Sequence, residues 1–444
     1  MLGTLSENPT TRAFLADVRS VDTTHEAFGS THAWLKRPIF NRPAFLDAAD
    51  VARLDHDLGA VFDLLTSVPD RFFGGDPAAM ATALGLPLVQ AEAVLRSPSA
   101  TRPARIGRAD LMTDGNTFRL VEFNTTSSLG GCEVAEMSRA MRADQRLDVF
   151  ADQYGLGFHD PIVAMTESLS PALPMAVVKW PNSPETANDF SHMTLFLERL
   201  AAGGFDAAPC HIGQLEYRDG KLFAAGRHVQ QVFRTFQLGR LTDTAESREL
   251  AAPLLAAVGD GAAALFTPLA ADLYGIKECL ALISEDRHRD LFTADELDVI
   301  DRVLPWTRYL RADKTTRAGQ PVDLLEHVRE NREDLVIKPS VGFAGQGITA
   351  GWMVDQAEWE RRVDDALRDA YVVQERVTPV VERFADDSEP NVLAPCLLSW
   401  GAFFGERGYT GAFIKGIPRG TQDIRFLGDG SHVGCVFHAT SGSQ

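Results

Sequence analysis

The sequence contains little lysine, and its few cysteines are scattered. Arginine far outnumbers lysine, and the lysines are only Lys36, Lys179, Lys221, Lys277, Lys314, Lys338 and Lys415. A lysine beside a suggestive motif is therefore more informative here than in most proteins. The cysteines have no CxxC pair and no histidine at ligand spacing: Cys132, Cys210, Cys279, Cys396 and Cys435. This spacing argues against a disulfide framework or a structural zinc site and favours reduced, buried thiols.

Long apolar runs and a positive net charge are also missing. No stretch approaches about 18 uninterrupted apolar residues, so no membrane span is predicted. The N-terminus has no basic start followed by an apolar run, so no signal peptide is predicted either. The net charge of −18 argues against nucleic acid as the main partner. We therefore expect a cytoplasmic protein whose partners are small molecules rather than nucleic acid or membrane.

The chain is long enough for more than one structural lobe. With 444 residues, 45% of them hydrophobic and 23% charged, it has the composition of a globular protein with two or three lobes. Apolar spacing predicts a helix over 48–65 within a mainly helical segment, residues 1–100. Further helices are predicted over 133–148, 250–265 and 269–282. A strand over 175–180, a helix over 188–200 and a strand over 229–236 predict a βαβ-like substrate lobe.

The most informative stretch is GRADLMTDGNTFRLVEFNTTSSLGG, residues 107–131. The Asp-Gly dipeptide at 114–115 favours a hairpin turn between two β-patterned runs. Polar residues occupy every second position, with Arg108 and Asp110 before the turn and Glu122 and Asn124 after it. Strand alternation therefore places each pair on one face of its own strand.

The register of this hairpin decides whether the two pairs share a face. The two pairs share a face only if each residue of one strand pairs with a residue of the other whose number gives an even sum. A three-residue loop at 114–116 predicts this register, whereas a two-residue turn places the two pairs on opposite faces. On a shared face, two carboxylates, an amide oxygen and a guanidinium converge. These oxygen atoms suit Mg²⁺, and the arginine suits a carboxylate or a phosphate. The alternative is an exposed hairpin with a solvated polar face.

A second informative region, DLVIKPSVGFAGQGITAG, lies in the C-terminal third. An apolar strand leads directly into Lys338 and a proline, and glycines follow at 342, 345 and 347. Glycines let backbone N–H groups approach phosphate oxygens, and the lysine supplies a positive charge. The order differs from a Walker A motif, because the lysine precedes the glycines. The pattern favours a nucleotide phosphate site over an ordinary hairpin loop.

One arginine lies inside an apolar strand pattern. Arg234 occurs in VFRTF, residues 232–236. A buried arginine is unfavourable unless it is paired. The residue therefore either meets an internal acid or faces an anionic ligand, and the sequence leaves both interpretations open.

Together these motifs resemble the ATP-grasp superfamily. More narrowly, they resemble its permuted branch, which includes glutathionylspermidine synthetases and eukaryotic-type glutathione synthetases. In that branch the E-x-N metal motif precedes the ATP-binding lysine strands, as residues 122–124 precede Lys314 and Lys338 here. The TTSS and GG segments after the motif, and the VFRTF strand, are similar to substrate-contacting segments of those enzymes. The resemblance covers about residues 105–440.

The resemblance implies the fold and its parts. It implies a mixed α/β (α+β) ATP-grasp fold in circularly permuted order, with N-terminal helices and an inserted α/β substrate lobe. The expected units are N-terminal helices over 1–100, a metal-binding hairpin and helix over 101–174, a substrate lobe over 175–264, and an ATP-grasp core over 265–444.

The resemblance also implies roles for individual residues. The expected metal ligands are Asp110, Glu122 and Asn124. The expected ATP-binding residues are Lys314, Lys338, Gly342, Gly345, Gln346 and Gly347, with Gln374 and Glu375 near the adenine or ribose. Arg108 is expected to hold the activated carboxylate, and Arg419 the transferred phosphate. The expected substrate contacts are Arg108, Arg234, Ser127 and Ser128.

The implied activity is that of an ADP-forming carboxylate–amine ligase that uses ATP and two Mg²⁺ ions. We expect an acid–amino-acid ligase that joins amino acids or small peptides into a dipeptide-type amide, with a γ-glutamyl amide as one form. One alternative is a peptide–polyamine ligase, for which the acidic loop Asp386-Asp387-Glu389 is the only sequence feature. Another is a non-catalytic ATP-grasp-like binding protein. The sequence leaves the oligomeric state open, with a homodimer as one option.

Overall fold

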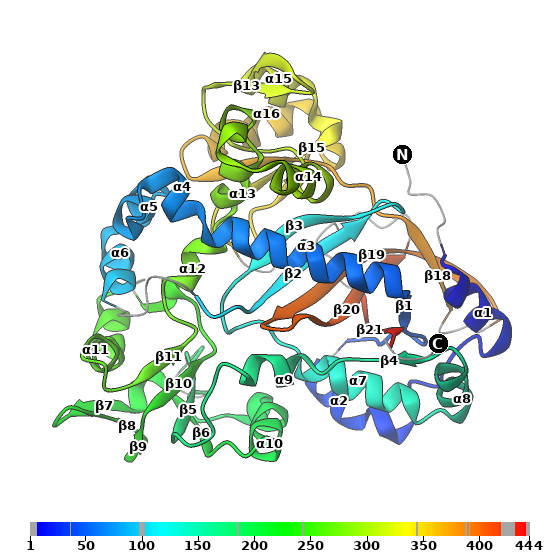
Figure 1. Ribbon diagram of the computed structural model, residues 1–444, viewed down its shortest axis with the longest axis horizontal. Coiled ribbons are helices and arrows are strands. Elements are labelled where there is room, and N and C mark those ends of the chain that lie inside the picture. The colour runs from blue at the N-terminus through cyan, green and yellow to red at the C-terminus, as the bar shows by residue number, and fades with distance from the viewer. Residues whose placement is uncertain are drawn as a thin grey trace.

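The computed structural model describes residues 7–35, 37–96, 103–183, 186–241, 244–342, 345–386, 389, 391–418 and 431–440. Its centre is an eight-stranded, largely antiparallel sheet (Figure 1). The main strand order is β1–β21–β20–β19–β2–β3, while β18 pairs with β19 and β4 with β21. The bounds are β1 Ala44–Leu46, β2 Gly107–Thr113, β3 Phe118–Asn124, β4 Leu156–Gly157, β18 Val381–Ala385, β19 Leu393–Gly405, β20 Gly408–Pro418 and β21 His432–Ala439.

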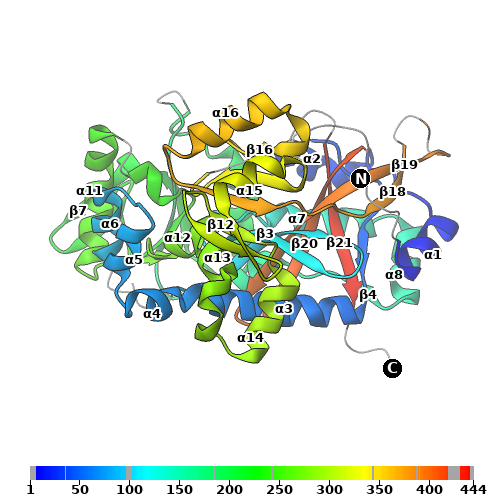
Figure 2. The same ribbon diagram turned by 90° about the horizontal axis from the view of Figure 1, so that it is seen from above.

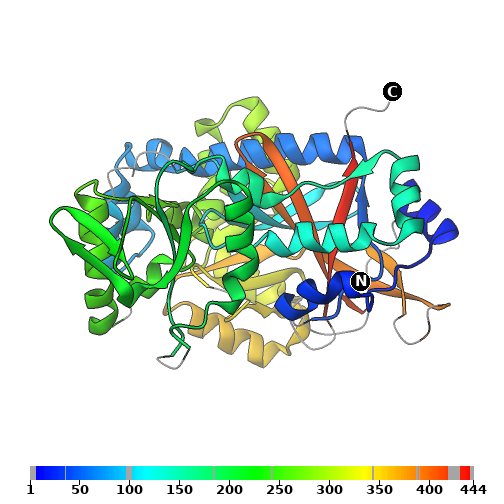
Figure 3. The ribbon, with the colours of Figure 1, turned by 90° about the horizontal axis from the view of Figure 1, so that it is seen from below.

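Helices cover both faces of the central sheet. The helix α3 (Ala48–Thr66) packs on one face, and α7 (Cys132–Arg142) packs on the other (Figures 1 and 3). The Asp47 side chain caps α3 by accepting the Asp50 N–H at 2.8 Å, and the helix buries one apolar stripe against the sheet. The predicted helix over 48–65 is confirmed. The other N-terminal helices are α1 Pro9–Asp17, α2 Gly29–Leu35, α4 Val68–Phe73, α5 Pro77–Ala83 and α6 Leu88–Leu95.

A second sheet is parallel throughout, in the order β11–β10–β5–β6. Its strands are β5 Met175–Lys179, β6 Ala207–His211, β10 Gln231–Arg234 and β11 Ala264–Phe266. The predicted strands over 175–180 and 229–236 are β5 and β10, which pair in parallel, and the predicted helix is α10 (Thr194–Ala202), which begins at Thr194 rather than at 188. The chain leads from α10 first into β6, so the second strand of the βαβ unit is β6 and not the predicted strand over 229–236. A small sheet follows, made of β7 Leu215–Arg218, β8 Lys221–Ala224 and β9 Arg227–Val229.

A third sheet is antiparallel, in the order β12–β17–β15–β16. Its strands are β12 Thr307–Tyr309, β15 Leu335–Pro339, β16 Thr349–Ala350 and β17 Tyr371–Glu375. The helices α15 (Leu324–Glu330) and α16 (Gln356–Ala366) pack on it around the buried Trp359, beside the hairpin β13 (Lys314–Arg317) and β14 (Gln320–Asp323). Figure 2 shows this lobe from above.

Three predicted helices are wrong in detail. The segment 133–148 is broken into α7 and α8 (Gln145–Gln153), because the Asp144 side chain caps a new helix there. The helix predicted over 250–265 is α11 (Ala245–Gly259), which begins and ends earlier; Gly261 follows at φ +70°, and the strand β11 begins at Ala264. The segment 269–282 contains α12 (Ala271–Tyr274) and α13 (Lys277–Ser284), separated at Gly275. This last break places Lys277 at the start of a helix.

The remaining helices of the described segments are α9 Pro161–Thr166 and α14 Ala294–Val303. All five cysteines are buried and free, as the sequence predicts. Among the described residues, no helix is both long enough and apolar enough to cross a membrane.

Candidate active site

The hairpin β2–β3 brings its four polar residues onto one face of the central sheet. Arg108 pairs with Asn124, and Asp110 pairs with Glu122. The shared face predicted from the sequence is confirmed, but the predicted three-residue loop is wrong. Strand pairing ends at Thr113 and Phe118, so the loop has four residues. A bulge at Val121 inserts one extra residue into β3, and beyond it the paired residue numbers have the even sum that places both pairs on one face. The bulge therefore sets which face the carboxylates occupy.

These side chains form an ion pair at the base of the hairpin. Arg108 Nε donates to Asp110 Oδ1 at 3.0 Å, and Arg108 Nη1 donates to the Leu129 carbonyl at 2.6 Å. Burial opposes charge on Asp110, but the Arg108 guanidinium, helped by Lys415, lowers the pKa of this carboxyl group. Burial likewise opposes charge on Arg108, but Asp110 and Glu122 raise its pKa. Both groups therefore stay charged at neutral pH.

Three lysines from three different elements surround the two carboxylates. Lys277 Nζ, at the start of α13, donates to Glu122 Oε1 at 2.9 Å. Lys338 Nζ, on β15, donates to Gln374 Oε1 at 2.5 Å and to the Val121 carbonyl at 3.3 Å. Burial, reinforced by the charge of Lys277, lowers the pKa of Lys338 to about 8. Lys415, on β20, is also largely buried; burial lowers its pKa, while Asp110 and Glu122 oppose that shift.

Sequence reasoning assigned no role to Lys277 or Lys415. Gly401 pairs with both Asp110 and Phe413, so Lys415, two residues beyond Phe413, lies on the same sheet face as Asp110. The one available signal was the scarcity of lysine. By contrast, Lys314 is exposed at the start of the hairpin β13–β14, and no described contact joins its side chain to Glu122, Lys277 or Lys338. The structure brings Lys277, and not Lys314, to the carboxylates.

The other expected ATP-binding residues lie near Lys338. Gln374 is buried, and its Nε2 donates to Thr307 Oγ1 at 3.0 Å while its oxygen accepts from Lys338. Glu375 forms an ion pair with Arg317. Gly342 follows β15 and lines a pocket. Gly345 and Gly347, on either side of Gln346, have positive φ. Arg419 lies outside the described residues.

Arg234 meets an internal acid. The side chain is fully buried and forms an ion pair with Asp272 through both terminal nitrogens. Its Nε also donates to the Thr267 carbonyl at 2.8 Å, and Nη1 to the Phe236 carbonyl at 3.0 Å. Its donors are engaged within the protein, which supports the internal-acid interpretation, and a direct contact between Arg234 and substrate stays a prediction. Asp272, which Arg234 holds, lines the pocket.

The two serines bind the backbone of the same strand region. Ser127 Oγ is buried and donates to the Arg234 carbonyl at 2.6 Å, and Ser128 Oγ donates to the Thr235 carbonyl at 3.4 Å. Neither serine is among the residues that line the pocket, whereas the preceding Thr125 and Thr126 are. The serines connect the end of the hairpin to β10 rather than presenting free hydroxyl groups.

We expect Arg234→Met to lower the free energy of unfolding by about 3 kcal/mol, because it leaves the partly buried Asp272 carboxylate without its cation. The matched control is Arg227→Met, which breaks a surface ion pair with Asp206 and should change that free energy by less than about 1 kcal/mol. Denaturant unfolding of both variants measures the difference. Equal changes in the two variants contradict the structural role assigned to Arg234.

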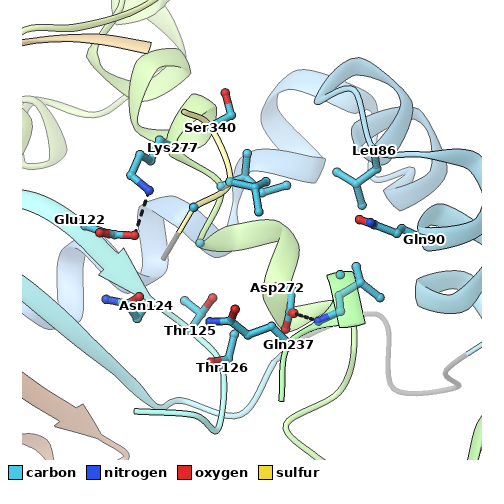
Figure 4. Close-up of a pocket in the computed structure, with 16 residues that line it drawn as sticks. Leu86, Gln90, Glu122, Asn124, Thr125, Thr126, Gln237, Asp272, Lys277 and Ser340 are labelled. Atoms are coloured by element: carbon cyan, nitrogen blue, oxygen red, sulfur yellow. Dashed lines mark hydrogen bonds and ion pairs between the residues drawn. The ribbon is translucent and has the colours of Figure 1, made fainter. Parts of the chain in front are cut away.

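A pocket extends from Glu122 and Asn124 of the hairpin to the parallel sheet (Figure 4). It contains about 610 Å³ of empty space, part of it open to solvent. One end is formed by Glu122, Asn124, Lys277 and the start of the glycine-rich loop. The other end follows the carboxyl edges of β10 and β11, where open α/β sheets commonly bind ligands. The pocket therefore joins the hairpin to the predicted substrate lobe.

The oxygen atoms at the first end fit Mg²⁺ bound together with a phosphate. Among the described residues, no three His, Cys, Asp or Glu side chains are grouped to hold a metal. Glu122, Asp110 and Asn124 instead supply two carboxylates and an amide, and Mg²⁺ commonly takes one or two protein carboxylates and completes its shell with substrate phosphates and water. Lys277, which pairs with Glu122, and Arg108, which pairs with Asp110, can also neutralise phosphate oxygens.

Comparison with solved structures shows a similarity that extends over most of the chain. A glutathione synthetase-like effector from Globodera pallida matches with a TM-score of 0.57 and 13% sequence identity, over 94% of this chain and 99% of the effector. The chain has an ATP-grasp fold, as its sequence predicts. At this identity the similarity shows the fold and leaves activity and substrate to be argued from the site.

Two other solved structures match more weakly. A gamma-glutamylcysteine synthetase-like protein from Methylobacillus flagellatus has a TM-score of 0.42 and 13% identity, over 84% of this chain and 86% of its own. A RimK-domain ATP-grasp protein from Sphaerobacter thermophilus has a TM-score of 0.25 and 15% identity, over 59% of this chain and 90% of its own. Similarities this weak support no argument. No protein-family model and no curated protein matches the sequence.

Proposed function

We propose that this protein is an ATP-dependent, ADP-forming carboxylate–amine ligase. The observation that carries the proposal is the cluster of Asp110, Glu122, Lys277, Lys338 and Arg108 in an ATP-grasp fold, of which Glu122 and Lys277 line one end of a pocket. Two carboxylates and an amide suit Mg²⁺, and several cations suit a triphosphate. No nucleophilic side chain is needed for this chemistry.

In this proposal the metal ligands are Asp110, Glu122 and Asn124. Lys277 and Lys338 bind ATP phosphates, the glycine-rich loop at 342–347 covers them, and Gln374 positions Lys338 through its amide oxygen. Bound Mg²⁺ supplies positive charge that stabilises the transferring phosphoryl group. The permuted order of the fold and the phosphate-binding role of Arg419 belong to the same proposal and rest on the family resemblance.

The first step activates an acid. A carboxylate oxygen attacks the γ-phosphorus of ATP, the bond to the β-phosphate oxygen breaks, and ADP leaves. Arg108 holds the carboxylate, and the lysines neutralise charge on the phosphates. In the second step an amine attacks the acyl carbon, inorganic phosphate leaves, and the amine proton passes to solvent. Closure of the glycine-rich loop excludes water, which otherwise hydrolyses the acyl phosphate.

The proposed substrates are amino acids joined into a dipeptide-type amide, and this choice rests on the resemblance alone. Neither alternative gains support from a particular contact. Asp387 of the acidic loop offered for a polyamine lies outside the described residues. The assembled carboxylates and lysines argue against a purely structural role. Release of ADP and phosphate with pooled amino acids and polyamines tests the proposal, and lack of stimulation by every pool overturns it.

We expect Lys277→Met to lower kcat/KM by about 100-fold, the effect of removing one preorganised charge partner from a reacting phosphate. Lys314→Met removes a lysine from an exposed strand of the same lobe and should change kcat/KM by less than about threefold. Steady-state ADP release by the two variants gives the comparison. A larger loss of kcat/KM in Lys314→Met than in Lys277→Met contradicts this assignment and supports the expectation that Lys314 binds ATP.

A further inference from the structure

The two ends of the pocket differ in charge and in the groups they offer. Figure 4 shows Glu122 and Lys277 at one end, joined by their ion pair, with Asp272, Gln237 and Thr126 farther along the wall. We call the region of Asp272, Gln237 and Thr126 the distal end. Among the described lining residues Lys277 is the only cation, and Glu122 already pairs with it. The distal end therefore presents an acid, an amide and a hydroxyl group.

Asp272 is held in place with part of its acceptor capacity unused. Its carboxylate accepts from Arg234 Nη1 and Nη2 and from the Leu238 N–H, the last at 2.7 Å. An ionised carboxylate has about four acceptor positions. Three are occupied, and the side chain, 12% exposed, lines the pocket. The fourth position is therefore available to a hydrogen-bond donor in the pocket.

We propose that Asp272 binds an ammonium group of the acyl substrate, and that this substrate carries no second carboxylate at the distal end. The inference rests on the proposed function, because it assigns this pocket to the acid that is activated. The substrate that is activated is therefore an acid that carries a positively charged amino group. Gln237 and Thr126 can accept the remaining ammonium protons, since both side chains line the same end.

Charge excludes a dicarboxylate from the same position. A second carboxylate at the distal end would lie beside Asp272, and like charges brought together in a partly desolvated site repel each other. Arg234 cannot compensate, because the side chain is fully buried and its nitrogens already bind Thr267, Phe236, Pro268 and Asp272. The inference thus disfavours the γ-glutamyl form of the reaction, which keeps an α-carboxylate next to the ammonium group.

Equilibrium binding tests this inference separately from ligase activity. Isothermal titration is done with Mg²⁺ and a non-hydrolysable ATP analogue present. The probes are individual neutral amino acids, β-alanine and γ-aminobutyrate, each compared with the same acid lacking its amino group, together with L-aspartate and L-glutamate. We expect an ammonium-bearing monocarboxylate to bind at least tenfold more tightly than its des-amino partner and than both dicarboxylic amino acids.

Two substitutions move this preference in opposite directions. Asp272→Asn keeps one oxygen, which can accept from Arg234 Nη1 and the Leu238 N–H, but it replaces the oxygen that accepts from Nη2 by an NH2 group and removes the charge. It should weaken ammonium-bearing probes at least tenfold while leaving des-amino probes and nucleotide affinity within threefold. Gln237→Glu leaves the Arg234–Asp272 pair intact and adds a negative charge, so it should tighten the same probes. Asp206→Asn, in an exposed arginine pair, is the matched control and should change nothing.

The outcomes separate the two proposals. The role of Asp272 is overturned if amino and des-amino acids bind equally, if a dicarboxylate binds most tightly, or if no ammonium-bearing acid binds. It is also overturned if both pocket variants keep the binding preference of the parent protein. If the binding preference follows the charge of the distal end but no amine stimulates ADP release, the role of Asp272 stands and the ligase proposal fails.

Discussion

Glu122→Gln is expected to lower kcat for ADP release by between about 100-fold and 1,000-fold. The substitution keeps the side-chain volume and an oxygen that can accept from Lys277, but it removes the charge proposed to bind Mg²⁺. The Mg²⁺ concentration for half-maximal activity should rise at the same time. Activity measured across a Mg²⁺ titration at saturating ATP gives both quantities.

A matched control separates this effect from a loss of structure. Glu216→Gln changes an exposed glutamate on β7, which pairs only with the exposed Arg218 among its described salt-bridge partners, and should leave kcat and the Mg²⁺ requirement unchanged. Glu216→Gln should keep the thermal unfolding temperature of the parent. Glu122→Gln should unfold cooperatively at a lower temperature, because the buried Lys277 loses its ion pair, and the loss of kcat is read below that temperature. Parental activity in Glu122→Gln contradicts the assignment of Glu122 as a metal ligand.

Lys338→Met is expected to stabilise the protein while weakening ATP binding at least tenfold. The pKa of Lys338 is lowered to about 8 from 10.5, mainly by burial, which corresponds to about 3 kcal/mol of unfavourable free energy in the charged form. Loss of two hydrogen bonds offsets about 1 kcal/mol of this gain. The expected net gain in the free energy of unfolding at pH 7 is therefore about 2 kcal/mol.

The pH dependence of that gain identifies its cause. Between pH 8 and about 10.5 the unfolded chain keeps the lysine proton and the folded protein does not, so the stability of the parent protein rises with pH over this range. The advantage of Lys338→Met should fade over the same interval. Denaturant unfolding at pH 7 and pH 10, with the exposed Lys221→Met as control, measures it. A destabilised Lys338→Met protein with normal ATP affinity contradicts the account.

The hairpin shows how much of the site the sequence could predict. Alternation along each strand placed Arg108 with Asp110 and Glu122 with Asn124, and the structure confirms that all four share a face. The reason was not predictable, because the shared face depends on the bulge at Val121 compensating a four-residue loop. The buried apolar residues change parity across the bulge, from Phe118 and Leu120 to Phe123, but Val121 is apolar too and fits an unbroken alternation with Phe123. Pattern reasoning therefore reached the right face through the wrong loop.

Lys277 and Asp272 show where sequence reasoning stopped. Both lie in the segment 269–282, which reads as one core helix because of its alanine and leucine content. The break at Gly275 divides it and brings both side chains to the pocket wall. The expectation for Lys314 rests on the family resemblance, but Lys314 begins the hairpin β13–β14, where it is exposed. Long-range packing, which periodicity does not report, decided between the two lysines.

Transfer of ¹⁸O from the acid to phosphate tests the central claim most directly. The protein is incubated with ATP, Mg²⁺, an amine and a carboxylic acid whose two carboxylate oxygens are ¹⁸O, and the released phosphate is analysed by mass. A ligase that works through an acyl phosphate must produce ADP together with phosphate carrying one ¹⁸O atom, and an amide carrying the other. Unlabelled phosphate, or formation of AMP and pyrophosphate, contradicts the proposed function.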